Sequence, residues 1–208
     1  MAKRKRLFDL SVGIPLALLS LPFVVVFAVG SAVSYRAWPL FTQQRLGVNG
    51  RSFTFVKIRS LPVSAPDEAD KYELAFVENN RCGRFLRRYH LDELPQLWLV
   101  VFGKMSLVGP RPEMPFLSEM FDQEFVGERL TMRPGCTGLW QISTASAGLI
   151  GEAPEFDLHY VRNWTMRFDL WVLAHTAYEI LGGASVKDVG QVPTWTGAAL
   201  AEPAEALV

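Results

Sequence analysis

Residues 10–33 contain no charged side chain, and this stretch limits the fold more than any other feature of the sequence. A helix needs about 20 consecutive apolar residues to cross the hydrocarbon of a bilayer, so the segment predicts a membrane element. The basic run at residues 3–6 is expected to hold the N-terminus in the cytoplasm. A cleaved signal peptide is the alternative, but its apolar region typically has only about 7 to 15 residues.

The residues of this segment leave two shapes open. A straight span would carry the chain after Arg36 to the far side of the membrane, whereas a re-entrant helix would keep both ends in the cytoplasm. Pro22 lacks an N–H and clashes with the preceding turn, so it should kink the helix, and Pro15 weakens the helix further. Spanning helices also tolerate proline where a side chain such as that of Ser20 bonds a freed carbonyl.

The composition favours one compact domain beside this element. Half of the 208 residues are apolar and 20% are charged, which argues against disorder. The net charge is zero, but residues 1–111 hold 16 basic and 8 acidic side chains, and the remainder holds 5 and 13. A basic front half suggests anionic partners such as phosphates or lipid head groups, while the neutral total argues against general nucleic-acid binding. Cys82 and Cys136 lack zinc-ligand spacing, and a reducing cytoplasm fits them best.

Residues 40–61 predict two short strands joined by a turn at residues 48–50, with Phe53, Phe55 and Ile58 as apolar positions. The basic side chains of this hairpin form either a solvated face or a phosphate site; they are Arg45, Arg51, Lys57 and Arg59. Residues 62–80 predict an exposed acidic loop or short helix. Residues 156–181 predict one or two helices whose tryptophans and other apolar side chains form either ordinary core or a membrane-surface contact, since tryptophans are enriched at the level of lipid head groups.

The stretch RRYHLDELPQLWLVVFG, residues 87–103, sets Asp92 and Glu93 between arginines and an almost uncharged run. Arginines at helical spacing precede the two acids: Arg81, Arg84, Arg87 and Arg88. One interpretation is that an acid caps a second helix with Pro95 in its first turn, worth about 1 kcal/mol. The other is an anion site in which the arginines and the helix N-terminus keep both carboxylates ionised.

Two Arg-Pro turns follow. Residues 108–112, VGPRP, predict a stiff turn that fixes the guanidinium of Arg111, whose planar fork suits phosphate oxygens. Residues 132–141, MRPGCTGLWQ, hold Arg133 in a glycine-rich loop, and this arginine is a further candidate for phosphate binding. An Arg-Pro-Gly motif by itself is weak support for a phosphate site.

The order of these motifs resembles the bacterial sugar transferase family. The resemblance runs from about Lys5 to about Leu181, through KRLFDL and the apolar segment, FTQQRLG, KIRSL, LDELPQLW, MSLVGPRP and RPGCTGLWQ. Such proteins are monotopic phosphoglycosyl transferases, which move a hexose 1-phosphate from a UDP-sugar to undecaprenyl phosphate. KIRSL or RPG alone would mean little, but the combination is specific.

The resemblance implies roles for individual residues. Asp92 matches the nucleophile, which would carry a covalent phosphosugar after UMP leaves, and Glu93 matches its partner that binds Mg2+. Arg87 and Arg111 match phosphate contacts. The family has a strand that reads Lys-x-Arg-Thr-Met, here KIRSL, and its basic pair is matched by Lys57 and Arg59. The proline that breaks the family's membrane helix into a re-entrant hairpin is matched by Pro22, which favours a cytoplasmic position for both helix ends.

The implied fold is α+β, with an N-terminal re-entrant membrane helix over residues 1–36. The helix packs on a small mixed catalytic domain with interfacial amphipathic helices, residues 37–184, and residues 185–208 are expected to form a mobile tail. The expected location is the cytoplasmic face of the bacterial inner membrane. The expected partners are a UDP-sugar, undecaprenyl phosphate and membrane lipids, with Mg2+ as cofactor and no nucleic acid. The oligomeric state stays open, with a homodimer as one option.

The sequence also departs from the family pattern. Lys104 stands where the family usually has Asp, Leu99 where Asn is common, and Leu21 where Ser usually precedes the proline. Residues 142–148 lack the arginine that often follows the Arg-Pro-Gly motif. Two rival functions therefore stay in view. One is a non-catalytic membrane scaffold of the same fold, and the other is a glycosyltransferase that moves sugar without phosphate and releases UDP.

Overall fold

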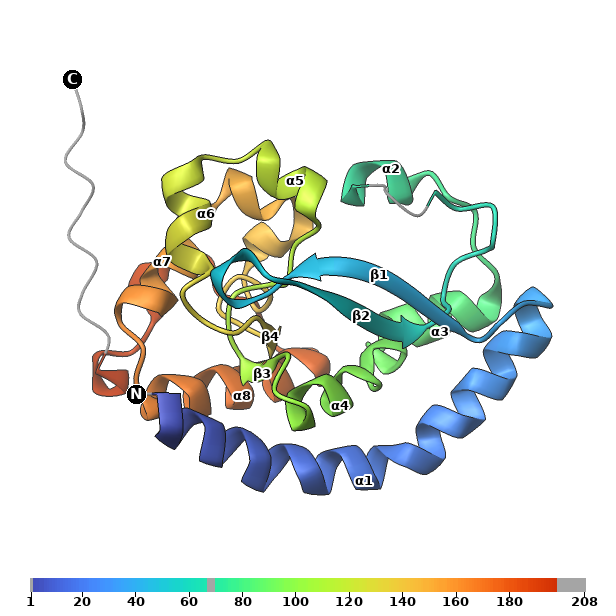
Figure 1. The fold of residues 1–208 in the computed structure, drawn as a ribbon, viewed down its shortest axis with the longest axis horizontal. Coiled ribbons are helices and arrows are strands. Elements are labelled where there is room, and N and C mark those ends of the chain that lie inside the picture. The colour runs from blue at the N-terminus through green and yellow to red at the C-terminus, as the bar shows by residue number, and fades with distance from the viewer. Residues whose placement is uncertain (1, 67–69, 198–208) are drawn as a thin grey trace.

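The computed structural model describes residues 2–66 and 70–197 of the chain. Its helices and strands, in chain order, are α1 (Ala2–Tyr35), β1 (Leu40–Leu46), β2 (Ser52–Ile58), α2 (Lys71–Ala75), α3 (Arg81–Arg88), α4 (Gln96–Val101), β3 (Ser106–Val108), α5 (Pro115–Glu119), α6 (Gln123–Arg129), β4 (Gly135–Thr137), α7 (Pro154–Arg162) and α8 (Met166–Ile180). The mixed helix and sheet content agrees with the α+β prediction. Figure 1 shows α1 arching beneath the other elements.

The long helix α1 runs without interruption through Pro15 and Pro22. The chemistry of proline predicts a kink at Pro22, and the family resemblance implies a break there, whereas the structure has a continuous helix that curves, with its concave side toward the domain (Figure 1). A proline inside a helix removes one hydrogen bond and crowds the preceding turn, and a bend is enough to relieve that crowding. The hydroxyl of Ser20 donates to the carbonyl of Ala17 at 2.9 Å, within the same stretch. The correction is therefore from a break to a bend.

One face of α1 packs on the domain and the other is exposed and apolar. The buried face uses small side chains at helical spacing, and a Cβ at Gly13 would already lie 3.2 Å from Cγ1 of Val100 in α4. The small buried residues farther along this face are Ala17, Ser20 and Ser31. The exposed apolar residues are Leu7, Ile14, Leu16, Leu18, Leu19, Leu21, Phe23, Val25, Val26, Val29 and Val33. By length and composition α1 could cross a membrane, and it is the one described helix with that property.

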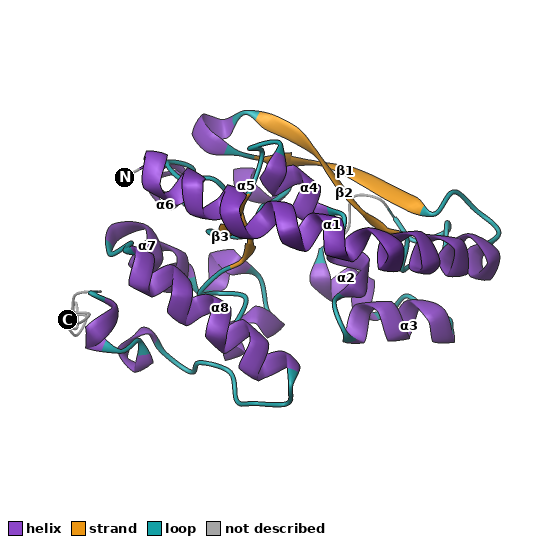
Figure 2. Ribbon diagram, turned by 90° about the horizontal axis from the view of Figure 1, so that it is seen from below, coloured by secondary structure: helices purple, strands orange, loops and turns teal. Residues whose placement is uncertain are grey.

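Both ends of α1 bind the same domain. Near its start, the guanidinium of Arg6 donates to the carbonyls of Val100 and Val101 at 2.6 and 2.7 Å. Near its end, the hydroxyl of Ser31 donates to the carbonyl of Arg59 at 2.6 Å. Figure 2 shows the result from below: α1 crosses the molecule with β1 and β2 along one side and α3 and α8 on the other.

The predicted hairpin is confirmed. β1 and β2 pair antiparallel in the register Leu40 to Ile58 and Leu46 to Ser52, and residues 48–50 form the connecting turn. The apolar side chains of β2 are buried in the core as predicted, and they are Phe53, Phe55 and Ile58. A second, parallel pair joins β3 to β4. This pair brings the two Arg-Pro turns of the sequence together.

The C-terminal segment differs from the sequence prediction. Residues 185–197 were expected to belong to a mobile tail, but Val186 pairs with Ser143, and Val192 and Thr196 are buried. The apolar Val186 and Val192 belong to the main core, and this explains why the chain stays on the domain. Residues 198–208 of the expected tail lie outside the described residues.

Candidate active site

Asp92 lies on a short turn between α3 and α4. His90 adopts a left-handed backbone with φ of 53°, which redirects the chain after α3 into the single 3-10 turn of residues 91–93. The Asp92 side chain is only 4% exposed, and its Oδ2 accepts a hydrogen bond of 2.7 Å from the hydroxyl of Ser60, which follows β2. Pro95 occupies the N-cap position of α4, and no side chain forms a capping hydrogen bond there. Neither Asp92 nor Glu93 therefore caps α4, and the capping interpretation is wrong.

A cavity of about 250 Å³ contains most of the predicted site residues. Five of them line it together: Lys57, Arg87, Asp92, Glu93 and Arg111. Arg45, a member of the basic hairpin set, also lines the cavity, and the remaining wall includes His90, Glu113 and Trp140, which the sequence did not single out as site residues. A buried carboxylate, a second carboxylate and several cations in one cavity suit a ligand that carries phosphate groups.

The electrostatics of Asp92 differ from the expectation. Burial raises the pKa of its carboxyl, and the charge of Glu93 adds to that rise. The Ser60 hydrogen bond and the charges of Lys57 and Arg87 oppose the rise without cancelling it. The sequence predicted that the cations would dominate, but burial outweighs them. Burial likewise lowers the pKa of the Lys57 amine, and the charges of Asp92 and Glu93 oppose that change.

The turn that carries Arg111 is held by two buried guanidinium groups. Arg129 donates to the carbonyl of Arg111 at 2.7 Å and forms a buried ion pair with Asp157. Arg45 donates to the carbonyl of Pro112 at 3.1 Å. The backbone of Arg111 is therefore fixed, as the predicted stiff turn requires.

Trp140 supports the Arg111 side chain at the cavity wall. The guanidinium lies 5.4 Å from the centre of the indole ring, within the range of a cation–π contact. The indole N–H is buried and has no hydrogen-bond partner among the described residues. A buried donor of this kind usually has an acceptor, so this N–H is available to an oxygen atom of a ligand.

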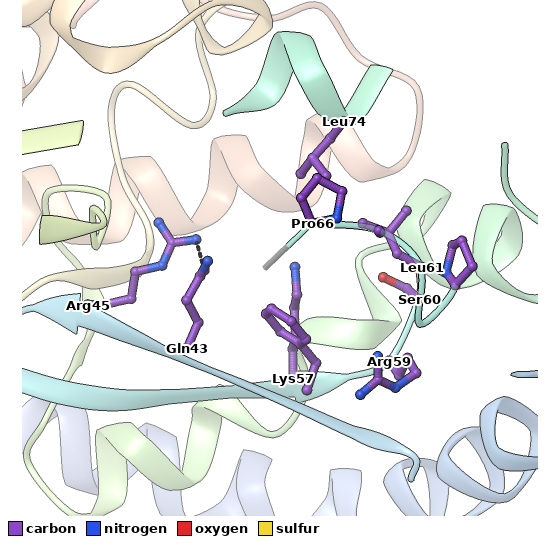
Figure 3. Close-up of a pocket in the computed structure, with 11 residues that line it drawn as sticks. Gln43, Arg45, Lys57, Arg59, Ser60, Leu61, Pro66 and Leu74 are labelled. Carbon is purple, nitrogen blue, oxygen red and sulfur yellow. Dashed lines mark hydrogen bonds between the residues drawn. The ribbon is translucent and has the colours of Figure 1, made fainter. Parts of the chain in front are cut away.

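The two other predicted phosphate-binding residues lie elsewhere. Arg59 lines a smaller neighbouring cavity of about 50 Å³, and its Nε donates to the carbonyl of Trp38 at 3.0 Å. Figure 3 shows this cavity, with the amine of Lys57 pointing into it below Pro66 and Leu74. Because Lys57 also lines the Asp92 cavity, the two cavities adjoin. Arg133 lies in a different cavity, described below, and its Nε donates to the carbonyl of Gly103 at 2.9 Å.

Arg45 and Glu113 form a buried ion pair with an N–O distance of 3.1 Å beside the cavity. Burial lowers the pKa of Arg45 to about 10, and the charge of Glu113 opposes that change. The guanidinium also donates to the side chain of Gln43 at 2.6 Å, which is the dashed contact in Figure 3. These bonds orient Arg45 along the cavity wall. The sequence placed Arg45 in a basic hairpin but gave no sign of its partner, because Glu113 lies 68 residues away.

The glycine of the Arg-Pro-Gly turn has a steric role. A Cβ at Gly135 would lie 2.1 Å from the backbone nitrogen of Gly109, far closer than any real contact. The backbones of the two turns can therefore pair: Gly109 donates to the carbonyl of Thr137, and Gly135 donates to that of Pro110, each at 2.9 Å. The second turn thus supports the one that carries Arg111.

A second cavity of about 390 Å³ meets the first. The two share four lining residues: His90, Glu93, Arg111 and Trp140. The second cavity extends to Thr176 and Ile180 of α8, whose end exposes the apolar side chains of Ile180 and Leu181. Two joined cavities, one reaching toward an apolar surface, can admit a polar ligand and a ligand with a lipid tail.

The chain is similar to known proteins over most of its length. The model of a family described as bacterial sugar transferase matches residues 1–183. A UDP-galactose-lipid carrier transferase of Erwinia amylovora is 34% identical over 85% of this chain and 40% of its own length. A UDP-glucose:undecaprenyl-phosphate glucose-1-phosphate transferase of Xanthomonas campestris pv. campestris is 35% identical over 77% of this chain and 35% of its own.

A shorter relative is covered more fully. The exopolysaccharide production protein ExoY of Sinorhizobium fredii is 33% identical, over 83% of this chain and 83% of its own length. The chain thus spans well under half of the first two relatives but most of this third one.

Proposed function

The chain belongs to the bacterial sugar transferase family, and we propose that it transfers a sugar 1-phosphate from a UDP-sugar to undecaprenyl phosphate. The names of several relatives describe such a reaction for UDP-glucose, which supports the donor and acceptor classes. The single observation that carries the proposal is the position of Asp92. It is buried, it is held by Ser60, and it shares one cavity with Lys57, Arg87 and Arg111.

The proposed reaction has two steps at Asp92. First, a carboxylate oxygen forms a bond to the sugar-bearing phosphorus, and the bond from that phosphorus to the bridging oxygen breaks, so that UMP leaves with the electron pair. Second, an oxygen of undecaprenyl phosphate attacks the same phosphorus, and the bond to Asp92 breaks. The carboxylate is regenerated, and no oxidant or reductant is needed. Two steps let a water-soluble donor and a lipid-bound acceptor use one site in turn.

The cations of the cavity provide electrostatic stabilisation in this proposal. Lys57, Arg87 and Arg111 line the same cavity as the nucleophile, so they can neutralise charge on the phosphoryl oxygens during both steps. The guanidinium of Arg111 is held against Trp140, which limits its motion. The buried Trp140 N–H can donate to one further substrate oxygen. Positioning and charge are the main contributions a protein makes to phosphoryl transfer.

We include Mg2+ in the proposal, with Glu93 as its protein ligand. Among the described residues, no group of three or more His, Cys, Asp and Glu is placed to hold a metal ion. Magnesium is commonly bound by one or two carboxylates together with substrate phosphates and water, so Glu93 fits this mode. The bound ion would neutralise charge on the donor phosphates. Chelation with EDTA is expected to stop UMP release by the full-length protein, and added Mg2+ to restore it; unchanged release would contradict the metal requirement.

For the membrane, we propose that α1 is re-entrant and that the domain lies on the cytoplasmic face of the bacterial inner membrane. The support is that Arg6 and Ser31, near opposite ends of α1, both bind the same domain. A straight span would place these ends on opposite sides of the bilayer. The exposed apolar face between them gives the hydrocarbon contact.

Cysteine accessibility tests this topology. One variant carries an added cysteine before Met1 and the other carries Ala37→Cys, each in a Cys82→Ser background. Burial raises the pKa of the remaining Cys136 thiol well above its usual range, so this cysteine is expected to react little. A membrane-impermeant maleimide should label both positions in inside-out vesicles and neither in right-side-out vesicles. Labelling of the two positions from opposite sides would refute the re-entrant helix.

The released nucleotide tests the reaction. The full-length protein is incubated with undecaprenyl phosphate, Mg2+ and each member of a panel of UDP-sugars. We expect UMP from at least one donor, because the bond that breaks joins the two phosphates. Release of UDP would instead indicate transfer of the sugar alone. Release of neither nucleotide from any donor would support the non-catalytic scaffold.

A further inference from the structure

We propose that a third cavity, on the side of the β1–β2 turn, binds the phosphodiester head group of an anionic phospholipid. The cavity measures about 560 Å³ and lies between the start of α1, the hairpin turn and the loop from α4 to β3. Three cations that the active site does not use line it together: Arg51, Lys104 and Arg133. Arg51 belongs to the basic hairpin, Lys104 stands where the family usually has Asp, and Arg133 belongs to the Arg-Pro-Gly turn. These positions are far apart in the sequence, and the fold brings them together.

These three cations have no acidic partner among residues 2–66 and 70–197. None of the ion pairs formed by the described residues includes Arg51, Lys104 or Arg133. Arg51 and Lys104 are exposed, and Arg133 is half-buried and oriented by its bond to the carbonyl of Gly103. Clustered cations repel one another, so a bound anion would relieve that repulsion.

The other two charged groups of the cavity are held by partners within the protein, and the single negative charge of Asp9 is smaller than the total charge of the three cations. Lys5 forms an ion pair of 2.5 Å with the buried Asp169. The carboxylate of Asp9 accepts bonds from the hydroxyl of Ser106 at 2.9 Å and from the backbone of Leu107 at 3.0 Å. The excess charge offered to a ligand is therefore positive.

The position of the cavity favours a lipid head group over a soluble anion. Lys5 and Asp9, on the first turns of α1, line the cavity, and they precede the apolar stretch of that helix. Leu7 on α1 is 70% exposed, and Phe102, which precedes the lining residue Gly103, is 69% exposed. Exposed apolar side chains next to clustered basic ones are typical of surfaces that bind anionic membranes.

This cavity is separate from the active site. None of the described residues that line it also lines either of the two joined cavities at Asp92. The proposal therefore does not depend on the proposed reaction and is tested without measuring activity. Bound head groups here would hold the domain on an anionic leaflet.

Native mass spectrometry of the full chain in nonionic detergent tests the proposal. The micelles are doped with phosphatidylglycerol or phosphatidylcholine, and a third sample receives inorganic phosphate. We expect wild-type protein to retain phosphatidylglycerol in preference to phosphatidylcholine. The double variant Arg51→Gln, Lys104→Gln should retain phosphatidylglycerol roughly 25-fold less tightly, since each basic residue near an anionic surface contributes roughly fivefold.

The matched control removes two exposed charges elsewhere, by Arg167→Gln and Lys187→Gln. It should bind phosphatidylglycerol like the wild type, which separates a defined site from net charge. An equal loss in the two double variants would overturn the proposal, as would equal retention of phosphatidylglycerol by wild type and the cavity variant. Binding of inorganic phosphate without a preference for phosphatidylglycerol would also overturn it and would identify a soluble anion as the ligand.

Discussion

Asp92→Asn is expected to lower the rate of UMP release by about 10^4-fold or more, because an amide cannot form the covalent phosphosugar. The change is nearly isosteric, and the amide oxygen can still accept the 2.7 Å bond from Ser60, so the cavity should keep its shape. UMP release is measured with the donor identified by the panel. Release at the wild-type rate would rule out Asp92 as the nucleophile.

Covalent trapping separates a nucleophile from a general base. Without acceptor, wild-type protein quenched in acid should gain the mass of one phosphosugar, and Asp92→Asn should gain none. Ser60→Ala is the matched control, because it removes one hydrogen bond to the carboxylate and leaves the nucleophile in place. Its rate should fall far less, and its phosphosugar adduct should remain detectable. A wild-type protein that releases UMP but never carries the adduct would contradict the two-step reaction.

The same Asp92→Asn substitution is expected to stabilise the fold at neutral pH. Burial raises the pKa of Asp92, so the folded state binds the carboxyl proton more tightly than the unfolded state does. The contribution of this group to stability is complete below its unfolded pKa and is lost as the pH rises through its folded pKa. Asparagine stays neutral throughout, so the variant should gain a few °C in Tm at pH 7 to 8. The gain should shrink toward acid pH, and a lower Tm at neutral pH would contradict it.

Secondary structure was predicted well where it depends on residues close together in the sequence. The hairpin turn at residues 48–50 and the alternation of Phe53 and Phe55 are such patterns, and both predictions are confirmed. The family resemblance predicted that three basic residues bind phosphate, and the structure brings all three to the Asp92 cavity: Lys57, Arg87 and Arg111. The role of each remains a prediction.

Long-range contacts could not be predicted in this way. Ser60 lies 32 residues from Asp92, and only the packing of β2 against the turn after α3 joins them. Arg133 has the same local signature as Arg111, an arginine beside a proline, yet the parallel pairing of β3 and β4 places the two in different cavities. The direction of the Asp92 pKa was also missed, because charge can be counted from the sequence but depth of burial cannot.

Asp169→Ala is expected to destabilise the protein by about 3–5 kcal/mol, the usual cost of breaking a buried ion pair. Asp169 is fully buried, and its carboxylate receives Lys5 at 2.5 Å, the Tyr160 hydroxyl at 2.6 Å and the Trp164 indole at 3.0 Å. Alanine would leave the buried charge of Lys5 without a counter-ion and the Trp164 N–H without its acceptor, while the Tyr160 hydroxyl keeps the Val108 carbonyl; Lys5 is a residue of α1. We therefore expect Tm to fall by roughly 10 °C or more in detergent and the start of α1 to become sensitive to protease.

The exposed ion pair between Arg162 and Glu128 provides the control, because its N–O distance of 2.7 Å is similar but the arginine side chain is 58% exposed. Glu128→Ala should change stability by no more than about 1 kcal/mol, since solvent screens such pairs. Removing both partners of the buried pair, by Lys5→Met with Asp169→Asn, should recover part of the loss because no unpaired charge remains. If Asp169→Ala costs no more than Glu128→Ala, the Lys5–Asp169 pair does not hold α1 on the domain. The contacts of Arg6 and the packing of Gly13 would then have to fix the start of the helix alone.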